Sequence, residues 1–544
     1  MPGIIGLLVK EVTGEEERLL DAMVTCMRHE SFYNHGIFSS PKDGLFVGYT
    51  AIQGSFSDCL PIWNETKDLA LFLSGECYVD SGVIGSLTCR GHSFTPDDAT
   101  YLIHLYEEVG EDLFLELNGW CNGILLDFRQ SRSVLFNDRY GIRRLYLHEY
   151  NNGLAFASEA KSLLRVFPEC RGLDAAAVGE LLCFDCVLEN RTCFSNIQLL
   201  PPGSVWTCRR GCVETKRSFE PASLENQAPL PAERFFGELG ATFKRVLPRY
   251  FFGGGTGLSL TGGLDTRSIL ACGDFASGEL PCYTFGGTYR DILDVRIAPH
   301  VAAACGQSHE VLRLSDAELL AEYPDLVQRA VYISDGIEGV DKADVIPLNK
   351  MARDIAPNRM TGKYGSQVLK GIVGFKERSP LAEIIAADFK PYLDEARETS
   401  SKIQQGSELS FALFSAIPWW WNGFVAIESS QLTVRSPHLD NDFIKVLYQA
   451  PNGLKGFGTR FQLDLIARNR PELMAMPTTG THGGNYPRPI AYGIKAAINI
   501  LLALDKIHQR EELPYGLTHT VGRLDHLLCA FGKRVRAIFF ARTA

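Results

Sequence analysis

The feature that most constrains the fold of this chain is the run at residues 257–270, which reads GLSLTGGLDTRSIL. Its apolar beginning predicts the end of a short buried strand, and residues 265–272 predict a helix. Gly262 and Gly263 form the tight turn between them, where the lack of side chains lets a ligand approach the backbone closely. A strand, a glycine turn and a helix N-terminus gather backbone N–H groups and the positive end of a helix dipole. The run therefore predicts a phosphate site rather than a plain turn.

The polar side chains of this run indicate how a phosphate would be held. Asp265 is acidic and cannot bind a phosphate directly, so we expect it to bind a Mg²⁺ ion that accompanies the phosphates. Thr261 and Thr266 offer hydroxyl groups for hydrogen bonds on either side of the turn, and Ser259 precedes it. No Gly-Lys-Ser/Thr follows the glycines, which excludes a Walker P-loop.

The whole run resembles the pyrophosphate loop of the ATP pyrophosphatase superfamily, usually written Ser-Gly-Gly-x-Asp-Ser. Thr261 and Thr266 stand at the positions of the two serines, and both keep a hydroxyl group. The resemblance implies that ATP is cleaved between its α- and β-phosphates, that AMP is transferred to a substrate oxygen, usually of a carboxylate, and that pyrophosphate is released. It implies ATP and Mg²⁺ as cofactors, Asp265 as a catalytic metal ligand, and nucleotide binding by Ser259, Thr261, Gly262, Gly263 and Thr266.

The composition limits the partners and the compartment. The chain has 544 residues, 45% of them hydrophobic and 22% charged, which is ordinary for a globular protein with two or more domains. A net charge of −10 without a basic run argues against nucleic acid, and no apolar run reaches the ~18 residues of a membrane span. The N-terminus lacks the features of a signal peptide, and the 15 cysteines are scattered, so we expect a cytoplasmic protein with reduced thiols. Cys183 and Cys186 match a redox or zinc spacing, but their apolar surroundings favour buried thiols.

Residues 1–215 predict an α+β domain in which sheets pack between helices. The expected strands are 3–10, 44–53, 70–78, 123–127, 133–138, 144–149 and 154–157. The expected helices are 15–27, 97–110 and 175–182.

This segment resembles the class II glutamine amidotransferase domain of asparagine synthetases, which implies an Ntn-hydrolase-like sandwich. The runs that match are Ile4-Ile5-Gly6, Leu73 to Tyr78, Asp98 with the helix after it, Leu117-Asn118-Gly119, Asn137 to Tyr146 and Phe156 to Leu163. In that family an N-terminal cysteine attacks the glutamine amide, and its own α-amine acts as the base.

The chemistry of that family is missing from the matched runs. Position 2 is Pro2, which offers no nucleophile, and Ser74 replaces the asparagine that donates to the oxyanion. The arginine expected near residues 49–52 to hold the glutamine carboxylate is absent. Asp98 and Glu76 remain, although structural roles would explain both of them. We therefore expect a domain without glutaminase activity.

Residues 216–232 are polar and contain prolines, which predicts a linker, and residues 233–544 predict a second domain. A helix is expected at 233–247, strands at 280–285 and 306–312, and a helix at 294–305. Strands that alternate with helices predict a parallel sheet, and long helical segments follow to the C-terminus. The order resembles the synthetase domain of asparagine synthetases, which implies an α/β ATP-pyrophosphatase domain, adenine nucleotide α-hydrolase-like, with a large helical C-terminal part.

Three further runs resemble that domain. Phe285 and Gly286 match a strand that lines the adenine pocket, and Gly306 to Glu310 matches a run at the same distance. Residues 434–440 resemble Val-Arg-x-Pro-Phe-Leu-Asp, in which Arg435 and Asp440 are explained equally well by an ion pair and a helix N-cap or by substrate contact. The tryptophans at 419–421 favour core packing over a pocket lining.

The second domain also departs from the family. Thr361 and Gly362 keep a hydroxyl and a backbone for the nucleotide, but Ser366 stands where a second Mg²⁺ carboxylate is expected. Residues 476–479 lack the expected lysine, and Thr478 lies in that stretch. Lys363 replaces a glutamate, and we expect its positive charge to stabilise the α-phosphate in the transition state.

The chain is thus identified as an asparagine synthetase-like ligase that adenylates a small-molecule or peptide carboxylate and lets ammonia or an amine displace AMP. Because Pro2 supplies no thiolate, intramolecular amide formation, as in β-lactam synthetases and lasso-peptide cyclases, is an alternative. A non-catalytic nucleotide-binding member is another. The resemblance also implies asparagine biosynthesis as a role and a homodimer as a possible assembly, but the sequence does not identify the carboxylate or the amine.

Overall fold

The structure is a computed structural model that describes residues 2–209, 212–287, 293–371, 376–378, 385–404, 407–451 and 457–479. By its internal packing the chain divides into two compact units. The first unit combines Met1–Thr256 with Ala317–Gly458, and the second combines Gly257–Asp316 with Thr459–Ala544. The mixed α/β fold contains antiparallel sheets, parallel strands and many helices. Among the described helices, none is both long and apolar enough to cross a membrane.

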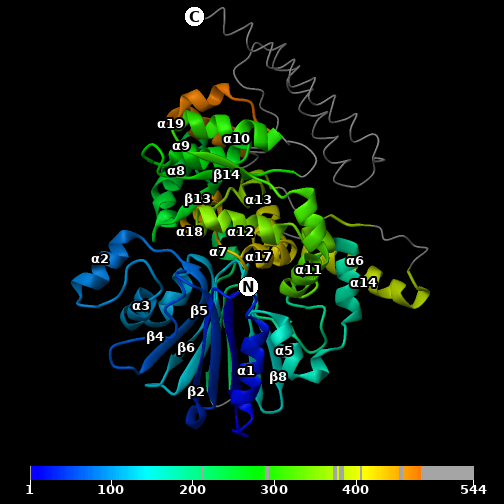
Figure 1. Ribbon diagram of the computed structural model, residues 1–544. Helices are drawn as coiled ribbons and strands as arrows, with labels where there is room; N and C mark the ends of the chain where they lie inside the picture. Colours follow the sequence, from blue (N-terminus) through cyan, green and yellow to red (C-terminus); the bar gives the residue numbers. More distant parts are fainter. Residues whose placement is uncertain are drawn as a thin grey trace, which may run out of the picture. The chain divides into compact units, whose positions relative to one another are not determined.

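A sandwich of two antiparallel sheets forms the N-terminal part of the first unit (Figure 1). One sheet has the order β10 (Gln198–Leu199), β8 (Tyr146–Tyr150), β9 (Gly153–Ala157), β1 (Gly3–Val9), β3 (Leu45–Ile52) and β2 (Tyr33–Ser40). The other has the order β12 (Cys212–Arg217), β11 (Ser204–Arg209), β7 (Arg132–Asn137), β6 (Gly119–Asp127), β5 (Leu69–Cys77) and β4 (Ile62–Trp63). Every residue of β1 and of β5 is buried, so these central strands are covered on both faces.

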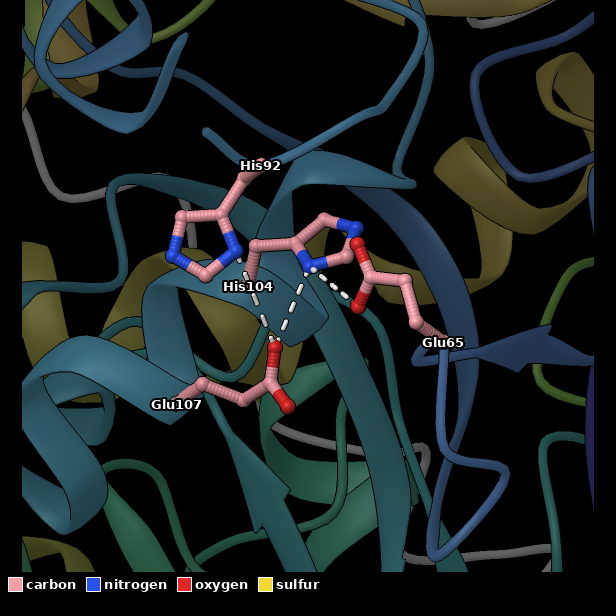
Figure 2. Close-up of side chains that lie close together, drawn as sticks. All are labelled: Glu65, His92, His104 and Glu107. Atoms are coloured by element: carbon pink, nitrogen blue, oxygen red, sulfur yellow. Dashed lines mark hydrogen bonds and ion pairs between the residues drawn. The ribbon is translucent and has the colours of Figure 1, made fainter. Parts of the chain in front are cut away.

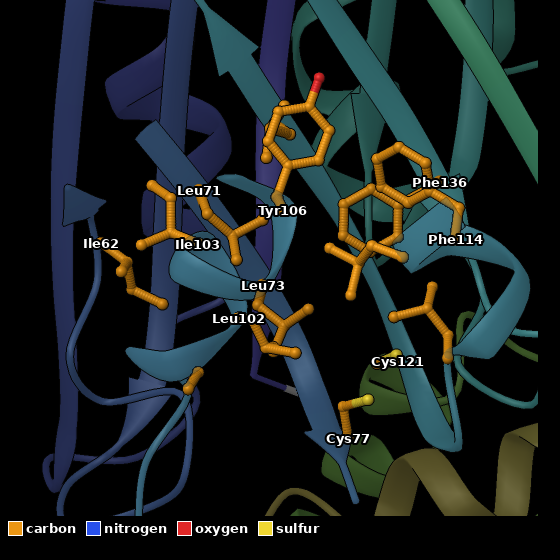
Figure 3. Close-up of a cluster of buried hydrophobic side chains, with 14 of the residues drawn as sticks. Ile62, Leu71, Leu73, Cys77, Leu102, Ile103, Tyr106, Phe114, Cys121 and Phe136 are labelled. Carbon is orange, nitrogen blue, oxygen red and sulfur yellow. The ribbon is translucent and has the colours of Figure 1, made fainter. Parts of the chain in front are cut away.

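Helices cover the outer faces of both sheets. A core that includes Ile4, Phe72 and Phe156 fills the space between the sheets. Helices α1 (Glu16–Cys26) and α5 (Ala160–Val166) pack on the first sheet. The second sheet is covered by α2 (Ser81–Cys89), α3 (Tyr101–Val109) and α4 (Leu113–Glu116), and Figure 3 shows side chains of α3 and α4 packed against β5, β6 and β7. This four-layer arrangement explains why the predicted strands and helices alternate along this part of the chain.

The predicted elements of the sandwich are confirmed, and two of the strands that were missed have several exposed side chains. All seven predicted strands overlap observed ones, and the three predicted helices correspond to α1, α3 and α6 (Ala175–Phe184). The missed β2 and β12 lie at sheet edges and carry many exposed side chains, which weakens the alternation that marks a half-buried strand. Strand β12 also extends two residues into the predicted linker, to Arg217.

The rest of the first unit is mainly helical. Its remaining helices are α7 (Ala222–Glu225), α8 (Ala232–Val246), α11 (Asp316–Ile333), α12 (Val345–Ile355), α13 (Gly365–Lys370), α14 (Lys390–Ile403), α15 (Glu408–Phe411), α16 (Ile417–Trp420), α17 (Asn422–Glu428) and α18 (Asn441–Leu447). Two short parallel strands, β16 (Asn358–Met360) and β17 (Thr433–Arg435), pair among them. Cys183 and Cys186 lie in a buried apolar cluster with Trp419, which confirms the predictions of buried thiols and of core packing for that tryptophan.

In the second unit, strands and helices alternate as predicted. The order is β13 (Thr256–Ser259), α9 (Leu264–Cys272), β14 (Cys282–Phe285), α10 (Leu293–Ala304) and β15 (His309–Leu312), followed later in the chain by α19 (Phe457–Asn469). β14 pairs in parallel with both β13 and β15. The carboxyl ends of these three strands therefore lie at one edge, which is where open α/β sheets bind their ligands.

Candidate functional site

The glycine turn lies at the carboxyl end of β13 and leads directly into α9, as the sequence predicted. The hydroxyl oxygens of Thr261 and Thr266 are 3.2 Å apart, and the backbone N–H of Thr261 donates to Thr266 Oγ1. The N–H of Gly263 donates to Thr261 Oγ1 at 3.3 Å. The two hydroxyl groups thus hold the turn together through hydrogen bonds within it. They lie beside the N-terminus of α9, where an anion is stabilised.

Crowding explains the glycine at position 262. A Cβ atom there would lie 2.8 Å from Thr479 Cγ2 and 3.0 Å from Ile297 Cβ, so a side chain would displace its neighbours. The N–H of Gly262 donates to Asp294 Oδ1 at 2.7 Å. Burial raises the pKa of Asp294, because desolvation disfavours its charged form. One backbone donor of the predicted phosphate site therefore already binds a carboxylate that the sequence analysis did not single out.

Arg267 ties a distant segment to this turn. Its buried guanidinium donates to the carbonyl oxygens of Gly262, Leu473, Met476 and Pro477 at 2.8–3.2 Å. Burial lowers its pKa to about 10. The N–H of Thr479 donates to the Gly262 carbonyl at 3.2 Å. The stretch 476–479, which the family resemblance had matched to a catalytic segment, therefore does lie beside the glycine turn.

Asp265 occupies the first turn of α9, next to the threonine hydroxyl groups. Gln462 of α19 donates from Nε2 to Asp265 Oδ1 and is itself buried. The amide thereby orients the carboxylate that the sequence assigned to Mg²⁺. Hydroxyl groups, backbone N–H groups and one oriented carboxylate form a donor set that suits a magnesium-bound pyrophosphate by ligand chemistry, since Mg²⁺ takes oxygen ligands.

Phe285 and Gly286 lie at the carboxyl end of β14, at the same edge as the glycine turn. The N–H of Gly286 donates to the carbonyl of Leu312 at 2.8 Å. A Cβ at Gly286 would lie 2.8 Å from Arg313 Cγ, so the backbone is closely covered there. The second unit thus brings together eight residues predicted to bind the nucleotide or its metal: Ser259, Thr261, Gly262, Gly263, Asp265, Thr266, Phe285 and Gly286.

Thr361, Gly362 and Lys363 belong to the first unit, directly after β16. Thr361 is buried, and its N–H donates to the carbonyl of Arg435 at 3.0 Å. The ammonium of Lys363 pairs with Glu428 and lies 4.4 Å from the centroid of the Phe424 ring. Burial lowers the pKa of Lys363. This lysine therefore has a charged partner inside the protein that the sequence did not reveal.

Glu428 also binds a second cation. Arg359 NH1 lies 2.8 Å from Glu428 Oε1 and 3.0 Å from Asn349 Oδ1. The side chains of Arg359, Lys363 and Glu428 are all at most 9% exposed, so the glutamate joins two buried cations. Ser366, which replaces an expected metal carboxylate, lies on α13 and accepts from Lys370 at 3.5 Å.

The N-terminal sandwich contains the pocket in which a glutaminase would carry its nucleophile. Pro2 immediately precedes β1, and its carbonyl oxygen accepts from Ser74 Oγ at 3.2 Å and from Arg143 at 3.4 Å. Arg143 also reaches Ser74 Oγ at 3.4 Å, and burial lowers the pKa of its guanidinium. Proline, serine and arginine thus bind one another where the family places a cysteine and an oxyanion donor.

The two acidic residues that remain there have partners within the fold. Glu76 forms a bidentate pair with Arg435 at 2.7 and 2.8 Å and accepts from the hydroxyl of Tyr78 at 2.6 Å. Asp98 accepts from the N–H and the hydroxyl of Thr100. Structural partners therefore explain both acidic residues.

Arg435 and Asp440, whose roles the sequence left open, take the structural ones. Arg435 is paired with Glu76, and Asp440 caps α18 by accepting from the N–H groups of Asp442 and Phe443. Asp440 also pairs with Arg249 at 3.0 Å. These contacts connect β5 of the sandwich with β17 and α18 within the first unit.

Comparisons with known proteins agree with these features. Residues 1–219 match the family model of the glutamine amidotransferase domain. Asparagine synthetase (glutamine-hydrolyzing) 1 of Bacillus subtilis (strain 168) is 24% identical over 340 residues, which are 60% of this chain and 52% of that protein. The nodule asparagine synthetase (glutamine-hydrolyzing) of Pisum sativum is 23% identical over 413 residues, 73% of this chain and 61% of that protein.

The chain is similar to asparagine synthetases over much of its length, and its first 219 residues match the glutamine amidotransferase domain. It spans about half the length of the curated relatives that it matches. Among solved structures, glutamine phosphoribosylpyrophosphate amidotransferase from B. subtilis, complexed with ADP and GMP, covers 76% of this chain at 11% identity. Its TM-score of 0.32 is too low to support an argument.

Several residues that organise the sites of this asparagine synthetase homologue were not found from the sequence. Asp294 stands at the start of a predicted helix after the second strand, a position that could have marked it as a ligand candidate. Arg267, Gln462 and Glu428 gave no such signal, because their partners lie 65–210 residues away in the chain.

Proposed function

We propose that this protein is an ATP-dependent ligase that joins a carboxylate to an amine with release of AMP and pyrophosphate. The observation that supports it most is the turn between β13 and α9. There Thr261, Thr266 and Asp265 lie together at the carboxyl edge of three parallel strands. This combination of hydroxyl groups, helix N-terminus and carboxylate suits a pyrophosphate group and its metal. In this protein the N-terminal sandwich would be Ntn-hydrolase-like, and the part with the glycine turn would be an adenine nucleotide α-hydrolase-like domain.

The proposed reaction has two steps. A carboxylate oxygen of the substrate attacks the α-phosphorus of ATP, the bond from that phosphorus to the bridging oxygen breaks, and pyrophosphate leaves. A nitrogen then attacks the acyl carbon and loses a proton, and AMP leaves with the electrons of the acyl–oxygen bond. Thr261, Thr266 and the start of α9 would bind the leaving pyrophosphate. Mg²⁺ at Asp265 would neutralise part of its charge.

The nitrogen would come from ammonia or from an amine of the substrate rather than from glutamine. In the sandwich, the carbonyl of Pro2 binds Ser74 and Arg143, and Glu76 is paired with Arg435. This arrangement supplies no nucleophile for a glutamine amide. It favours free ammonia or an intramolecular amine, as in β-lactam synthetases and lasso-peptide cyclases, over glutamine-dependent amidation.

The test is pyrophosphate release and ATP–pyrophosphate exchange by the full chain with ATP and Mg²⁺. The substrates are aspartate and a panel of carboxylates with and without an internal amine, each assayed with ammonium, with glutamine and with neither. We expect carboxylate-dependent release that ammonium or an internal amine supports and glutamine does not. Tight nucleotide binding without exchange for any carboxylate would instead indicate a non-catalytic nucleotide-binding protein. Glutamine-dependent product would overturn the proposed nitrogen source while leaving the ligase reaction intact.

A further inference from the structure

Two histidines and two glutamates converge on the outer side of the sandwich (Figure 2). Glu65 lies in the loop between β4 and β5, His92 in the loop after α2, and His104 and Glu107 one turn apart on α3. One nitrogen or oxygen atom of each side chain lies within 4.8 Å of the corresponding atoms of the other three. His104 is buried, His92 and Glu107 are half-buried, and Glu65 is exposed.

Three of the distances among these atoms are close to the edge length of a metal-centred tetrahedron. His104 Nδ1 lies 3.2 Å from Glu107 Oε2 and 3.6 Å from Glu65 Oε2, and His92 Nδ1 lies 3.9 Å from Glu107 Oε2. Ligands that bind a tetrahedral zinc ion at 2.0–2.1 Å lie about 3.4 Å from one another. A hydrogen bond explains the 3.2 Å between His104 Nδ1 and Glu107 Oε2. The distances from Glu65 to His104 and from His92 to Glu107 are too long for hydrogen bonds.

The outward-facing atoms of the same side chains are held by other residues. His92 Nε2 lies 2.9 Å from Glu108 Oε1, so the ring can donate there and present Nδ1 to the cluster. Asn64 Nδ2 donates to Glu107 Oε1 at 2.8 Å, which leaves Oε2 directed at the histidines. Partners of this kind fix the ring tautomer and the carboxylate orientation in metal sites.

We propose that Glu65, His92, His104 and Glu107 bind a Zn²⁺ ion. Two carboxylates and two neutral imidazoles balance the charge of a divalent ion, which suits a half-buried position. Mixed nitrogen and oxygen ligands in a four-coordinate set favour zinc, whereas Mg²⁺ and Ca²⁺ need six or more oxygen ligands. The ion would join three segments separated in sequence: the β4–β5 loop, the segment after α2, and α3. The site is structural, since all four ligands come from the protein.

The first test measures metal binding by the full chain after chelator treatment and removal of any affinity tag. We expect one equivalent of Zn²⁺ by titration calorimetry and by elemental analysis after dialysis. His92→Ala and Glu65→Gln should weaken binding at least 10-fold, and both residues lie in loops, where the variants are expected to fold. Glu108→Ala, which removes the positioning contact to His92 Nε2, should weaken it about 10- to 100-fold. His35→Ala, at an exposed histidine of β2, is the matched control and should bind as the parent protein does.

The second test separates a built site from incidental binding by histidines. Co²⁺ in place of Zn²⁺ should give the visible absorption bands of a tetrahedral complex in the parent protein and in His35→Ala, but not in His92→Ala. Zinc should also raise the Tm of the first two proteins more than that of the third, because only the folded state offers the site. Less than one equivalent of zinc, equal binding by His92→Ala and His35→Ala, or binding of Cu²⁺ alone would overturn the proposal.

Discussion

The glycine turn of the second unit and the nucleophile pocket of the sandwich show two different outcomes for residues that resemble those of one family. In the turn, Thr261, Thr266 and Asp265 remain and lie together at the edge of the parallel strands. In the pocket, the fold remains, but Pro2 and Ser74 occupy the positions of the reactive groups. The surviving Glu76 is paired with Arg435.

This difference teaches that a run of residues can resemble a family either because the fold needs those residues or because the reaction needs them. Glu76 and Arg435 form a buried ion pair, which is a structural reason to keep both residues, and removing one partner of such a pair costs about 3–5 kcal/mol. The two hydroxyl groups of the turn, by contrast, bond to each other and to a backbone N–H, and they organise a site at a helix N-terminus. A motif of small polar residues at a turn is therefore the stronger indication of function here.

The largest expected effect is that of Asp265→Asn. The amide keeps the shape of the side chain and can still bond to Gln462, but it loses the charge that a Mg²⁺ ligand needs. We expect pyrophosphate release to fall at least ~100-fold, in the range seen when one preorganised electrostatic group is lost. The Tm should stay near that of the parent. Asp274→Asn, at an exposed aspartate just after α9, is the control and should be fully active. Normal turnover of folded Asp265→Asn would reduce the turn to a structural feature.

A smaller effect on pyrophosphate release is expected for Lys363→Met, which compares a catalytic with a structural role of the same side chain. The role that its positive charge is expected to play at the α-phosphate predicts a ~100-fold loss of pyrophosphate release in Lys363→Met, with ATP binding weakened much less. Its buried pair with Glu428 predicts a loss of stability as well, about 3–5 kcal/mol by urea unfolding. The single variant therefore changes two properties at once.

The double variant Lys363→Met with Glu428→Gln separates these two roles of Lys363. It removes the negative partner too, so we expect part of the lost stability to return, while Arg359 keeps its bond to Asn349. Pyrophosphate release should stay ~100-fold low, as expected for a group that stabilises charge in the transition state. Recovery of release in parallel with stability would assign Lys363 to the structure alone.

Glu76→Gln addresses the pocket side of the comparison. In a working glutaminase this change would act on catalysis, but here we expect a loss of stability of about 3 kcal/mol, because Arg435 is left buried without its anionic partner. Pyrophosphate release per folded molecule should be unchanged. Glu15→Gln, in an exposed pair with Arg18, is the control and should unfold at the same urea concentration as the parent. A Glu76→Gln protein of normal stability would contradict the structural assignment.

The sequence predicted local features well and long-range partners poorly. Strand β13, the turn and α9 were predictable because periodicity and glycines are local signals. The parallel strands β13, β14 and β15 followed from their alternation with helices. By contrast, neither the Asp294 carboxylate on Gly262 nor the pair between Lys363 and Glu428 was predictable, because tertiary contacts between distant segments leave no periodic trace. The same is true of the outer cluster around His104.

The smallest expected effect, none at all, is that of Pro2→Cys. The variant places a thiol before β1, where the resemblance puts the nucleophile. The neighbours, however, keep their present contacts: Ser74 and Arg143 bind the carbonyl of residue 2, and Glu76 is paired with Arg435. A thiolate alone does not stabilise the oxyanion of an attacked amide, a contribution of about 100- to 1000-fold in comparable sites. We therefore expect glutamate release from glutamine to equal the no-enzyme rate, both in Pro2→Cys and in Pro2→Cys with Ser74→Asn, since the arginine expected near residues 49–52 is still missing. Mass spectrometry must first show that the initiator methionine is removed from both variants. Measurable glutaminase activity in either one would mean that one or two substitutions are enough to restore the chemistry, and that the glutamine site has been kept.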